Sequence, residues 1–445
     1  MDESEKIASQ PMIVNTEEKR EIPTVNKLLL TSHKDIIFTV PNEGIFMTGI
    51  ENSDPWVDGV RRDQFKEAYD FYTHYEKRLK NLSDIGIKWL RFGPSYSQTH
   101  RGSGVFDFSF CDSIIDRCKS LEINIIADLL HFGLPRWLHE ENDKEPFFQN
   151  SKFPEEFASY VKEFAKRYKH IKYFTIVNEP YVAAFFSAKI GIWNEQKRSK
   201  WFDDKDFITA IKNISKAAIL SRKAIQDIWK DENRPGFPIF MQNESFEVAT
   251  AVHTSREQEA HRFNLRRFAA LDLIFGKHDE SMRDYLISQG LTEEEYSWFM
   301  IHGTREHTIL GIDHYPTCIH LLEENTTINC DPTHPFQLYT LIIDYWNRYQ
   351  LPLIHTETNG WPKHALDICK KTYDTISQLR VEGYPILGMG WYGDEYQVGW
   401  HHALVGPRSY EENQVGLFYK GDIQPVGILF SKIAKKGFPP LILDF

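Results

Sequence analysis

The stretch Tyr173-Phe-Thr-Ile-Val-Asn-Glu-Pro180 joins a short apolar run to an abrupt polar end. A second stretch, Leu351-Pro-Leu-Ile-His-Thr-Glu-Thr-Asn-Gly-Trp361, has the same form. Short apolar runs bounded by Pro, Gly and polar residues are typical of strands that are buried on both faces of a parallel sheet. Each stretch places one glutamate, Glu179 or Glu357, where its strand would end. The spacing of the two glutamates along the chain fits strands four and seven of an eight-stranded barrel.

Short apolar runs alternate with amphipathic segments on both sides of these stretches, as in parallel β/α folds. In one segment, apolar residues recur every three or four positions from Phe65 to Leu82, and Gly86 then stops the predicted helix. We therefore expect an α/β fold of the (β/α)8 TIM-barrel class, a single domain with loop insertions. Its eight strands are predicted at Gly44–Thr48, Ile87–Phe92, Ile123–Asp128, Tyr173–Val177, Phe237–Gln242, Ile309–Asp313, Leu353–Thr356 and Ile386–Trp391.

The barrel domain is expected to cover residues 41–445, after an N-terminal arm or tail at residues 1–40. The first 40 residues mix charges with Thr, Asn and Pro and show no sustained periodicity. No internal repeat or Gly/Ser-rich linker divides the rest, and a chain of 445 residues is within the range of one barrel with insertions. The gap between strands five and six is too long for one crossover. We expect Glu244 to Thr308 to hold extra helices and loops over the catalytic face.

The charge of the chain argues against two classes of partner. Its formal net charge is −11 at pH 7, whereas binding to nucleic acid or to an anionic membrane requires clustered Lys and Arg. The start, Met1-Asp-Glu-Ser-Glu-Lys6, lacks the basic and apolar regions of a secretory signal, and no stretch approaches a membrane span. We therefore predict a cytoplasmic protein that binds neither nucleic acid nor a membrane.

The cysteines do not suggest a disulfide framework or a metal site. Cys111, Cys118, Cys318, Cys330 and Cys369 form no Cys-x-x-Cys pair, and an odd number leaves one of them unpaired in any scheme. Reduced thiols are the expected state. The sequence contains no zinc motif, and we predict neither a metal nor a cofactor.

Polar or aromatic side chains that core packing would not select lie at the ends of the predicted strands. They are Glu51, Asn52, Arg91, Asp128, His131, Asn178, Glu179, Gln242, Asn243, Glu244, Asp313, His314, Tyr315, Glu357, Trp391, Asp394 and Glu395. The carboxyl ends of all strands meet at one face of such a barrel, where reacting groups sit. A buried strand arginine needs a carboxylate partner. Glu357 would satisfy Arg91 and would be kept ionised by it.

Two carboxyl groups at one face of a barrel suit the cleavage of glycosidic bonds. This reaction uses one carboxylic acid to protonate the leaving oxygen and one carboxylate to attack the sugar or to direct water. Glu179 and Glu357 are the candidates. Burial of Glu179 among aromatic side chains and a positive charge beside Glu357 would separate their pKa values in the required sense.

Five segments, in consistent order over residues 40–420, resemble segments of the family 1 glycoside hydrolases. Thr175-Ile-Val-Asn-Glu-Pro180 resembles the family's Asn-Glu-Pro signature. Ile354-His-Thr-Glu-Thr-Asn-Gly360 resembles its Thr-Glu-Asn-Gly signature, with Thr358 inserted. The remaining three are Leu90-Arg91-Phe92, similar to Tyr-Arg-Phe; His131-Phe-Gly-Leu-Pro135, similar to His-Trp-Asp-Leu-Pro; and Gly311-Ile-Asp-His-Tyr315, similar to Gly-Ile-Asn-Tyr-Tyr.

The resemblance implies a retaining β-glycosidase on an eight-fold barrel. It implies exo action on a small carbohydrate, either an oligosaccharide or an aryl or alkyl glycoside, without a cofactor. In this family's scheme Glu179 would be the general acid/base and Glu357 the nucleophile, with Arg91 and Tyr315 holding Glu357.

The resemblance also implies a set of sugar contacts. Asn178 would bind the sugar 2-hydroxyl, and His131 and Trp391 would contact the non-reducing sugar. Glu51 falls near the place of a family glutamine that binds sugar hydroxyls. Glu395 and Gln397, which follow strand eight, are further candidates for sugar binding.

The segment after strand eight departs from the family pattern. Where typical members carry Asp-Asn-Phe-Glu-Trp, this chain reads Asp394-Glu-Tyr-Gln-Val-Gly-Trp400. Gln397 then stands in place of a sugar-binding glutamate. Either Glu395 and Trp400 substitute from shifted positions, or the sugar pocket differs. The Ser-Lys-Tyr pattern of the phospho-sugar branch is missing, and Asp394 and Glu395 are expected to repel a phosphate.

Three other interpretations stay open. A metal-dependent barrel hydrolase would use His131, His314 and His355 with the carboxylates, although strand one lacks a His-x-His pair. A non-catalytic or weakly active sugar-binding barrel is favoured by the altered segment and opposed by the two intact glutamates. A related-clan endo-glycanase is the nearest enzymatic alternative. The sugar, the linkage and the oligomeric state are left open by the sequence.

Overall fold

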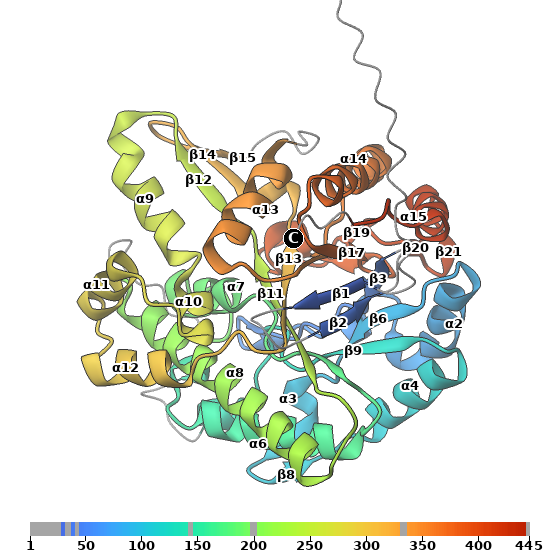
Figure 1. The fold of residues 1–445 in the computed structure, drawn as a ribbon, viewed down its shortest axis with the longest axis horizontal. Helices are drawn as coiled ribbons and strands as arrows, with labels where there is room; N and C mark the ends of the chain where they lie inside the picture. Colours follow the sequence, from blue (N-terminus) through green and yellow to red (C-terminus); the bar gives the residue numbers. More distant parts are fainter. Residues whose placement is uncertain are drawn as a thin grey trace, which may run out of the picture.

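The computed structural model describes residues 28–31, 37–40, 44–140, 146–195, 203–329 and 336–441. Eight parallel strands close into a barrel in the order in which they occur along the chain, and helices surround it (Figure 1). The strands are β3 (Ile45–Gly49), β6 (Trp89–Phe92), β9 (Asn124–Asp128), β10 (Tyr173–Thr175), β11 (Ile239–Ser245), β13 (Thr308–Asp313), β16 (Leu353–Glu357) and β17 (Ile386–Tyr392). The predicted barrel and its eight strands are confirmed.

Two neighbouring strands at the site differ from the predicted form. β11 continues past Gln242 to Ser245 because it stays paired with β13 up to Asp313. The ladder between β13 and β16 is irregular at this end, so that Asp313 lies opposite Glu357. A β-bulge of this kind redirects side chains. Here it brings two carboxyl groups from adjacent strands together.

The amino-terminal half of the barrel interior is filled with apolar side chains. These are Ile45, Met47, Ile126, Met241, Ile309, Ile354 and Leu387, which form one buried cluster. Side chains alternate between the two faces of a strand, so the next inward positions lie nearer the carboxyl ends. Asp313 on β13 is such a position and is polar, and the register shift between β13 and β16 places Glu357 opposite it. The polar groups therefore gather at one end of the barrel, above a dry interior.

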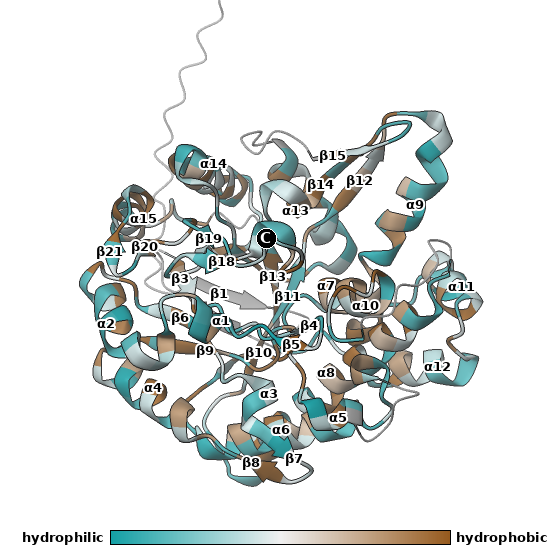
Figure 2. Cartoon of the chain, turned by 180° about the vertical axis from the view of Figure 1, so that it is seen from behind, coloured by the Kyte–Doolittle hydropathy of each residue, from teal (hydrophilic) through white to brown (hydrophobic). Residues whose placement is uncertain are grey.

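Helices form the outer ring, and Figure 2 shows that they carry both hydrophilic and hydrophobic residues. The main ones are α2 (Phe71–Asp84), α4 (Ser109–Ser120), α6 (Phe153–Arg167), α8 (Lys205–Asp231), α13 (Phe336–Tyr349), α14 (Pro362–Val381) and α15 (Pro425–Lys436). In α2 the apolar residues Phe71, Leu79 and Leu82 are buried. Gly86 follows with a φ of +88°, a left-handed conformation that glycine adopts without strain. This confirms its predicted role at the end of the helix.

The long segment between β11 and β13 contains the extra helices that were predicted. They are α9 (Glu257–Arg266), α10 (Ala269–Phe275), α11 (Glu280–Ser288) and α12 (Glu293–His302). The segment also supplies β12 (Val248–Ala251), which forms a small sheet with β14 (Ile319–Leu322) and β15 (Thr327–Asn329). Figure 1 shows this sheet and α9 projecting from the barrel. The small sheet was not predicted, because its short strands contain no sustained apolar run.

Short elements decorate the loops. They include α1 (Gln64–Glu67), α3 (Tyr96–Thr99), α5 (Arg136–Glu140), the pairs β4 (Trp56–Val57) with β5 (Val60–Arg61) and β7 (His100–Gly102) with β8 (Val105–Phe106), and the pairs β18 (Gln397–Val398) with β19 (Glu412–Asn413) and β20 (Phe418–Tyr419) with β21 (Asp422–Ile423). The last two pairs belong to the segment after β17 that departs from the family pattern.

Most of the predicted N-terminal arm lies outside the described residues. Within it, β1 (Leu28–Thr31) and β2 (Ile37–Val40) form an antiparallel pair. The division of the chain at residue 40 stays a prediction. Among the residues that the structure describes, no helix is at once long enough and apolar enough to span a membrane. Cys111, Cys118, Cys318 and Cys369 are buried free thiols, as predicted, and Cys330 lies outside the described residues.

A buried ion pair anchors the loop after β17 to the outer ring. Arg78 of α2 donates from Nε to Asp394 Oδ2 at 2.8 Å and from Nη2 to Asp394 Oδ1 at 2.6 Å. Both side chains are buried. Asp394 is therefore engaged with the outer ring.

Replacement of Arg78 by methionine should destabilise the protein by roughly 3–5 kcal/mol, because it leaves the Asp394 charge buried without its partner. Urea unfolding measures the effect. Lys80, on the same helix, pairs with Asp84 in an exposed bridge, and Lys80→Met should cost less than about 1 kcal/mol. Equal losses in the two variants would contradict the assignment of a structural role to the buried pair.

Candidate active site

Glu357 lies at the end of β16 and is held through both of its carboxylate oxygens. Arg91 Nη2 of β6 donates to Glu357 Oε1, and the Tyr315 hydroxyl donates to Glu357 Oε2. Glu357 is 3% exposed. The buried arginine predicted to need a carboxylate partner therefore has one, and it is the predicted one. Charge-assisted hydrogen bonds of this kind fix the orientation of a carboxylate.

Arg91 also joins Glu357 to the residues on the neighbouring strands. Its Nη1 donates to Asn178 Oδ1 at 3.0 Å, and its Nε lies 3.4 Å from Asp128 Oδ2. Burial by itself would lower the pKa of Arg91, but the negative charges of Asp128 and Asp313 and the Tyr392 hydroxyl raise it above its usual value. Arg91 therefore stays charged inside the barrel.

Glu179 directly precedes α7 (Pro180–Ala184), with Pro180 in the first turn. Its φ is +40°, in the left-handed region that non-glycine residues rarely adopt, so the backbone is strained at this point. The side chain is buried. Burial raises the pKa of Glu179 well above its usual value, the charges of Asp313 and Glu244 raise it further, and Arg91 opposes them. The Glu179 carboxyl therefore favours its protonated form more strongly than an ordinary glutamate does.

The carboxyl groups of Glu179 and Glu357 face each other across the mouth of the barrel. One carboxylate oxygen from each of Glu179, Asp313 and Glu357 lies within 4.8 Å of the others. Retaining glycosidases place their two carboxyl groups about 5–5.5 Å apart, whereas inverting ones leave room for a water molecule, at about 6.5–9.5 Å. In this chain the oxygen separation of at most 4.8 Å is shorter than the spacing of about 6.5–9.5 Å in inverting enzymes.

His131 is fixed between two polar neighbours. Its Nδ1 lies 2.8 Å from Asp128 Oδ2, and its Nε2 lies 3.3 Å from Asn178 Nδ2. The carboxylate can only accept, so Nδ1 carries the proton and Nε2 accepts from the Asn178 amide. Arg91, Asn178, His131 and Asp128 thus form one hydrogen-bonded chain along the buried side of the site.

Glu51 and Gln397 meet at the buried end of the cavity. Gln397 Nε2 donates to Glu51 Oε2 at 3.1 Å, and the backbone N–H of Ser53 donates to Glu51 Oε1 at 3.0 Å. Both side chains line the cavity. The chain therefore places a carboxylate at Glu51 and an amide at Gln397, the reverse of the glutamine and glutamate expected there from the family pattern.

Three of the predicted sugar contacts, Asn178, Trp391 and Glu395, are not among the residues that line the cavity. Asn178 is fully buried, and its amide contacts Arg91 and His131. Trp391 is fully buried, and its Nε1 donates to the carbonyl oxygen of Val415 at 2.9 Å. Glu395 accepts the backbone N–H groups of Lys420 and Gly421 at 2.8 and 2.6 Å, and burial raises its pKa to about 7. Glu395 holds the turn between β20 and β21.

The prediction that Asp394 and Glu395 repel a phosphate is wrong, because both carboxylates are engaged elsewhere. Asp394 is bound by Arg78, and Glu395 is occupied by backbone N–H groups. Neither carboxylate faces the cavity. Among the described residues that line it, none is Lys or Arg, and Glu51 and Glu247 present carboxyl groups instead. The described part of the cavity wall therefore offers a phosphate no lysine or arginine.

Tyr392 and Asp128 are site residues that the list of predicted contacts missed. The guanidinium carbon of Arg91 lies 4.8 Å from the centre of the Tyr392 ring. The same ring stacks on His131, with the two ring centres 5.9 Å apart. Asp128 fixes His131 and Arg91. Asp128 ends a predicted strand, so its position was a usable signal. Nothing in the sequence separates Tyr392 from its neighbour Trp391, because both continue the apolar run of β17.

Beyond these polar groups, the cavity is bounded largely by aromatic side chains. Its volume is about 450 Å³, and its wall includes Phe132, Phe186 and Trp400. Trp193 backs this wall, with its ring centre 4.6 Å from Phe186 and 5.7 Å from Trp400. Trp361 also lines the cavity and is 43% exposed. Flat apolar faces of this kind can pack against a sugar ring or an aromatic leaving group.

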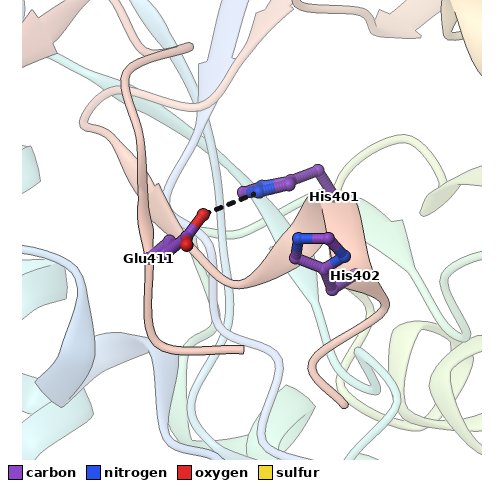
Figure 3. Close-up of side chains that lie close together, drawn as sticks. All are labelled: His401, His402 and Glu411. Atoms are coloured by element: carbon purple, nitrogen blue, oxygen red, sulfur yellow. Dashed lines mark ion pairs between the residues drawn. The ribbon is translucent and has the colours of Figure 1, made fainter. Parts of the chain in front are cut away.

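A cluster of potential metal ligands lies beside the cavity: His401, His402 and Glu411 (Figure 3). Asn413 donates from Nδ2 to Nδ1 of His401, because its own oxygen already accepts a backbone N–H. His401 Nε2 therefore carries the proton of the neutral ring and directs it at Glu411 Oε2, 3.4 Å away. A protonated nitrogen is not a metal ligand. Arg408 also binds both oxygens of Glu411, so the cluster fits a hydrogen-bonded network.

The histidines of the metal-dependent alternative do not converge on one point. Both ring nitrogens of His131 have partners, as described above. Burial lowers the pKa of His314 to about 4 and that of His355 to about 3. Among the described residues, none of the three belongs to a cluster of potential ligands. The donor arrangement does not support that alternative.

Known proteins share both the sequence pattern and the fold. Residues 57–378 match the family described as Glycosyl hydrolase family 1. The chain is 26% identical over 272 residues to Beta-glucosidase 25 of Oryza sativa subsp. japonica, which covers 56% of this chain and 52% of that protein. It is 26% identical over 134 residues to the 6-phospho-beta-galactosidase of Lacticaseibacillus casei, or 28% of this chain and 27% of that one. The chain thus aligns with about half, or less, of the length of these curated relatives.

Among solved structures, the Family 1 b-glucosidase from Thermotoga maritima superposes with a TM-score of 0.73 at 16% identity, over 90% of this chain and 99% of that chain. The Beta-glucosidase from Thermotoga maritima in complex with azafagomine superposes with a TM-score of 0.71 at 15% identity, with the same coverage. At these identities the likeness concerns the fold.

Proposed function

The chain belongs to glycosyl hydrolase family 1, and on this basis we propose that it is a retaining β-glycosidase. It hydrolyses β-linked glycosides through a covalent glycosyl-enzyme intermediate. The observation that carries the proposal is the pair of close carboxyl groups in unlike surroundings. Glu357 is held by Arg91 and Tyr315, while Glu179 is buried and its pKa is raised well above the usual value.

In the first half of the reaction, Glu357 attacks the anomeric carbon and Glu179 acts as general acid. A bond forms between a Glu357 oxygen and the anomeric carbon as the bond to the leaving oxygen breaks. The proton of Glu179 passes to that oxygen, so the leaving group departs as a neutral alcohol. Arg91 keeps Glu357 ionised before the attack.

In the second half of the reaction, Glu179 acts as general base and Glu357 is the leaving group. Glu179 is now a carboxylate and takes a proton from a water molecule. The water oxygen attacks the anomeric carbon, and the bond to Glu357 breaks. The sugar is released with its original anomeric configuration, and both side chains return to their starting states. No cofactor takes part in either step.

The substrate is a β-glycoside with an unphosphorylated terminal sugar, cleaved by exo action. The Glu51–Gln397 pair and His131 line the cavity and offer polar groups to the hydroxyls of one sugar ring. Asn178 supports this set from behind by its contact with His131. The lack of Lys and Arg among the described lining residues favours an unphosphorylated sugar over a 6-phospho-sugar. The aromatic wall then receives the leaving group.

A 2-deoxy-2-fluoro glycosyl fluoride tests the proposal directly. The fluorine slows both steps, while the good leaving group lets the first one proceed, so the intermediate accumulates. Incubation should add one sugar mass to the protein, and peptide mapping should place it on Glu357. Glu357→Gln is the matched control and should stay unlabelled. Labelling at another residue, or none with any of a panel of gluco-, galacto- and manno-configured reagents, would overturn the assignment.

Glu51 and Glu395 provide a matched pair of glutamates for testing the sugar pocket. Glu51→Ala should lower kcat/KM roughly 10- to 100-fold, because hydrogen bonds to charged groups contribute about 1.5–3 kcal/mol. Glu395→Gln should leave kcat/KM nearly unchanged, because Glu395 faces the β20–β21 turn. Steady-state kinetics on an aryl β-glycoside compare the two. A larger loss from Glu395→Gln than from Glu51→Ala would contradict this placement.

A further inference from the structure

Asp313 is a third carboxyl group at the reaction centre, and the proposed mechanism gives it no role. It ends β13 and is fully buried. The irregular ladder between β13 and β16 sets it opposite Glu357. One of its oxygens lies within 4.8 Å of an oxygen of Glu179 and of Glu357.

The contacts of Asp313 satisfy only one of its two oxygens. Oδ1 accepts from Thr356 Oγ1 at 2.6 Å and from Asn243 Nδ2 at 3.4 Å. Oδ2 has no hydrogen-bond partner and lies 3.9 Å from Arg91 Nη1. A buried ionised carboxylate normally has donors at both oxygens. Burial raises the pKa of Asp313 to about 6, against the opposing charge of Arg91.

The surroundings of Asp313 carry more negative than positive charge. The titratable and charged groups that face it from the neighbouring elements are Arg91, Asp128, His131, Glu179, Glu244, Tyr315 and Glu357. Arg91 is the one permanently charged cation in this set. It directs its hydrogen bonds to Glu357 and Asn178. Arg91 pairs with Asp313 only at 3.9 Å, so the charge of Asp313 is partly compensated and still acts on Glu179.

We propose that Asp313 is a positioning residue for the reaction, whose negative charge holds the proton on Glu179 until the leaving group takes it. This inference rests on the proposed function, in which Glu179 is the general acid. Two like charges close together in a low-dielectric site disfavour each other. Ionised Asp313 therefore opposes ionisation of Glu179. The enzyme keeps its acid protonated at pH values where burial alone would not suffice.

The charge of Asp313 widens the working pH range on the alkaline side. Near and above neutral pH, Asp313 is ionised and raises the pKa of Glu179. Below about pH 6, Asp313 is itself protonated and its effect on Glu179 is lost.

Asp313→Asn removes the charge and keeps the size of the side chain. With an alkyl or weakly activated aryl glycoside, the alkaline limb of the variant's profile of kcat/KM against pH should move to lower pH by about one unit or more. The activity lost at high pH should return when the leaving group is a dinitrophenolate, which needs no proton. A uniform fall in kcat/KM with an unmoved alkaline limb would show a merely structural role and overturn the inference.

Thr356→Val is the matched control, because it removes the hydrogen bond to Asp313 Oδ1 and leaves the charge in place. At alkaline pH Asp313 is ionised in this variant too. The alkaline limb should therefore stay where it is in the wild type. A shift equal to that of Asp313→Asn would mean that local packing, and not charge, sets the position of the limb.

Infrared titration separates this inference from the proposed function, since it needs no substrate. The carboxyl stretch of protonated Glu179 is identified by its loss in Glu179→Gln. Its midpoint should fall to lower pH in Asp313→Asn, and an unchanged midpoint would overturn the inference. Wild-type protein that the fluoro-sugars do not label would overturn the proposed function, whatever the midpoint does.

Discussion

Replacement of Glu357 by alanine should lower kcat on aryl β-glycosides by roughly 10⁴-fold or more, because the covalent path loses its nucleophile. Added azide should restore part of the turnover by entering the space left by the carboxylate. Because azide attacks from the Glu357 side in a single displacement, the product should be the α-glycosyl azide. Initial rates with and without azide, and the anomeric configuration of the product by NMR, measure both effects.

The variant also removes the partner of Arg91 and Tyr315, so its folding must be checked separately. Near-UV circular dichroism and the thermal midpoint serve this purpose. Glu357→Gln keeps the shape of the side chain and should be nearly as inactive. Turnover within tenfold of wild type in a folded Glu357→Ala protein would contradict the assignment of Glu357 as nucleophile.

Glu179→Ala should show a loss that depends on the leaving group. On glycosides with poor leaving groups, kcat/KM should fall by roughly 10²–10⁴-fold, the usual contribution of general acid catalysis. On a dinitrophenyl glycoside, the first step should stay fast because its leaving group needs no proton. The second step then limits turnover, and a burst of dinitrophenolate should appear in stopped-flow traces.

Azide distinguishes the two glutamates. In Glu179→Ala it should react with the glycosyl-enzyme on the side where the acid stood, and give the β-glycosyl azide. The opposite configuration is expected from Glu357→Ala. If the two variants yield the same anomer, the roles of acid and nucleophile have been wrongly divided.

Much of the fold could be predicted because the barrel repeats a simple physical pattern. Strands such as β13 and β16 are buried on both faces and read as uninterrupted apolar runs. The ends of the strands were less certain, since hydrogen-bonded pairing and not composition decides where a ladder stops. β11 extends to Ser245 for this reason. The small sheet of β12, β14 and β15 and the hairpin of β1 and β2 carried no comparable signal.

Within the site, the sequence indicated which residues meet wherever a buried charge required a partner. Arg91 and Glu357 are the clearest case, because an unpaired arginine inside a barrel costs too much free energy. Contacts after β17 could not be predicted in the same way. Trp391 and Tyr392 are adjacent aromatics on one strand, and only the register of β17 against β3 decides which one faces inward. Both Glu395 and Gln397 were candidates for sugar binding, but only Gln397 lines the cavity, because Glu395 accepts the backbone N–H groups of the β20–β21 turn.

The close contact between Asp313 and the two glutamates was also beyond the sequence. It depends on the irregularity at the end of β13, which shifts the pairing by a residue. The alternation of side chains along a regular strand does not predict such a shift in register. The strand-end position of Asp313 was visible, but its unsatisfied oxygen and its distance from Arg91 were not.

The barrel closes where β3 pairs with β17, although the two strands are far apart in sequence. The pairing runs from Ile45 opposite Gly388 to Gly49 opposite Tyr392. During synthesis, β3 emerges before β17 does. Until β17 is in place, the edge of β3 that it covers has no partner in the barrel, and unpaired edges of this kind are prone to association with other chains. Chaperone demand should therefore be concentrated in the interval before the last strand emerges.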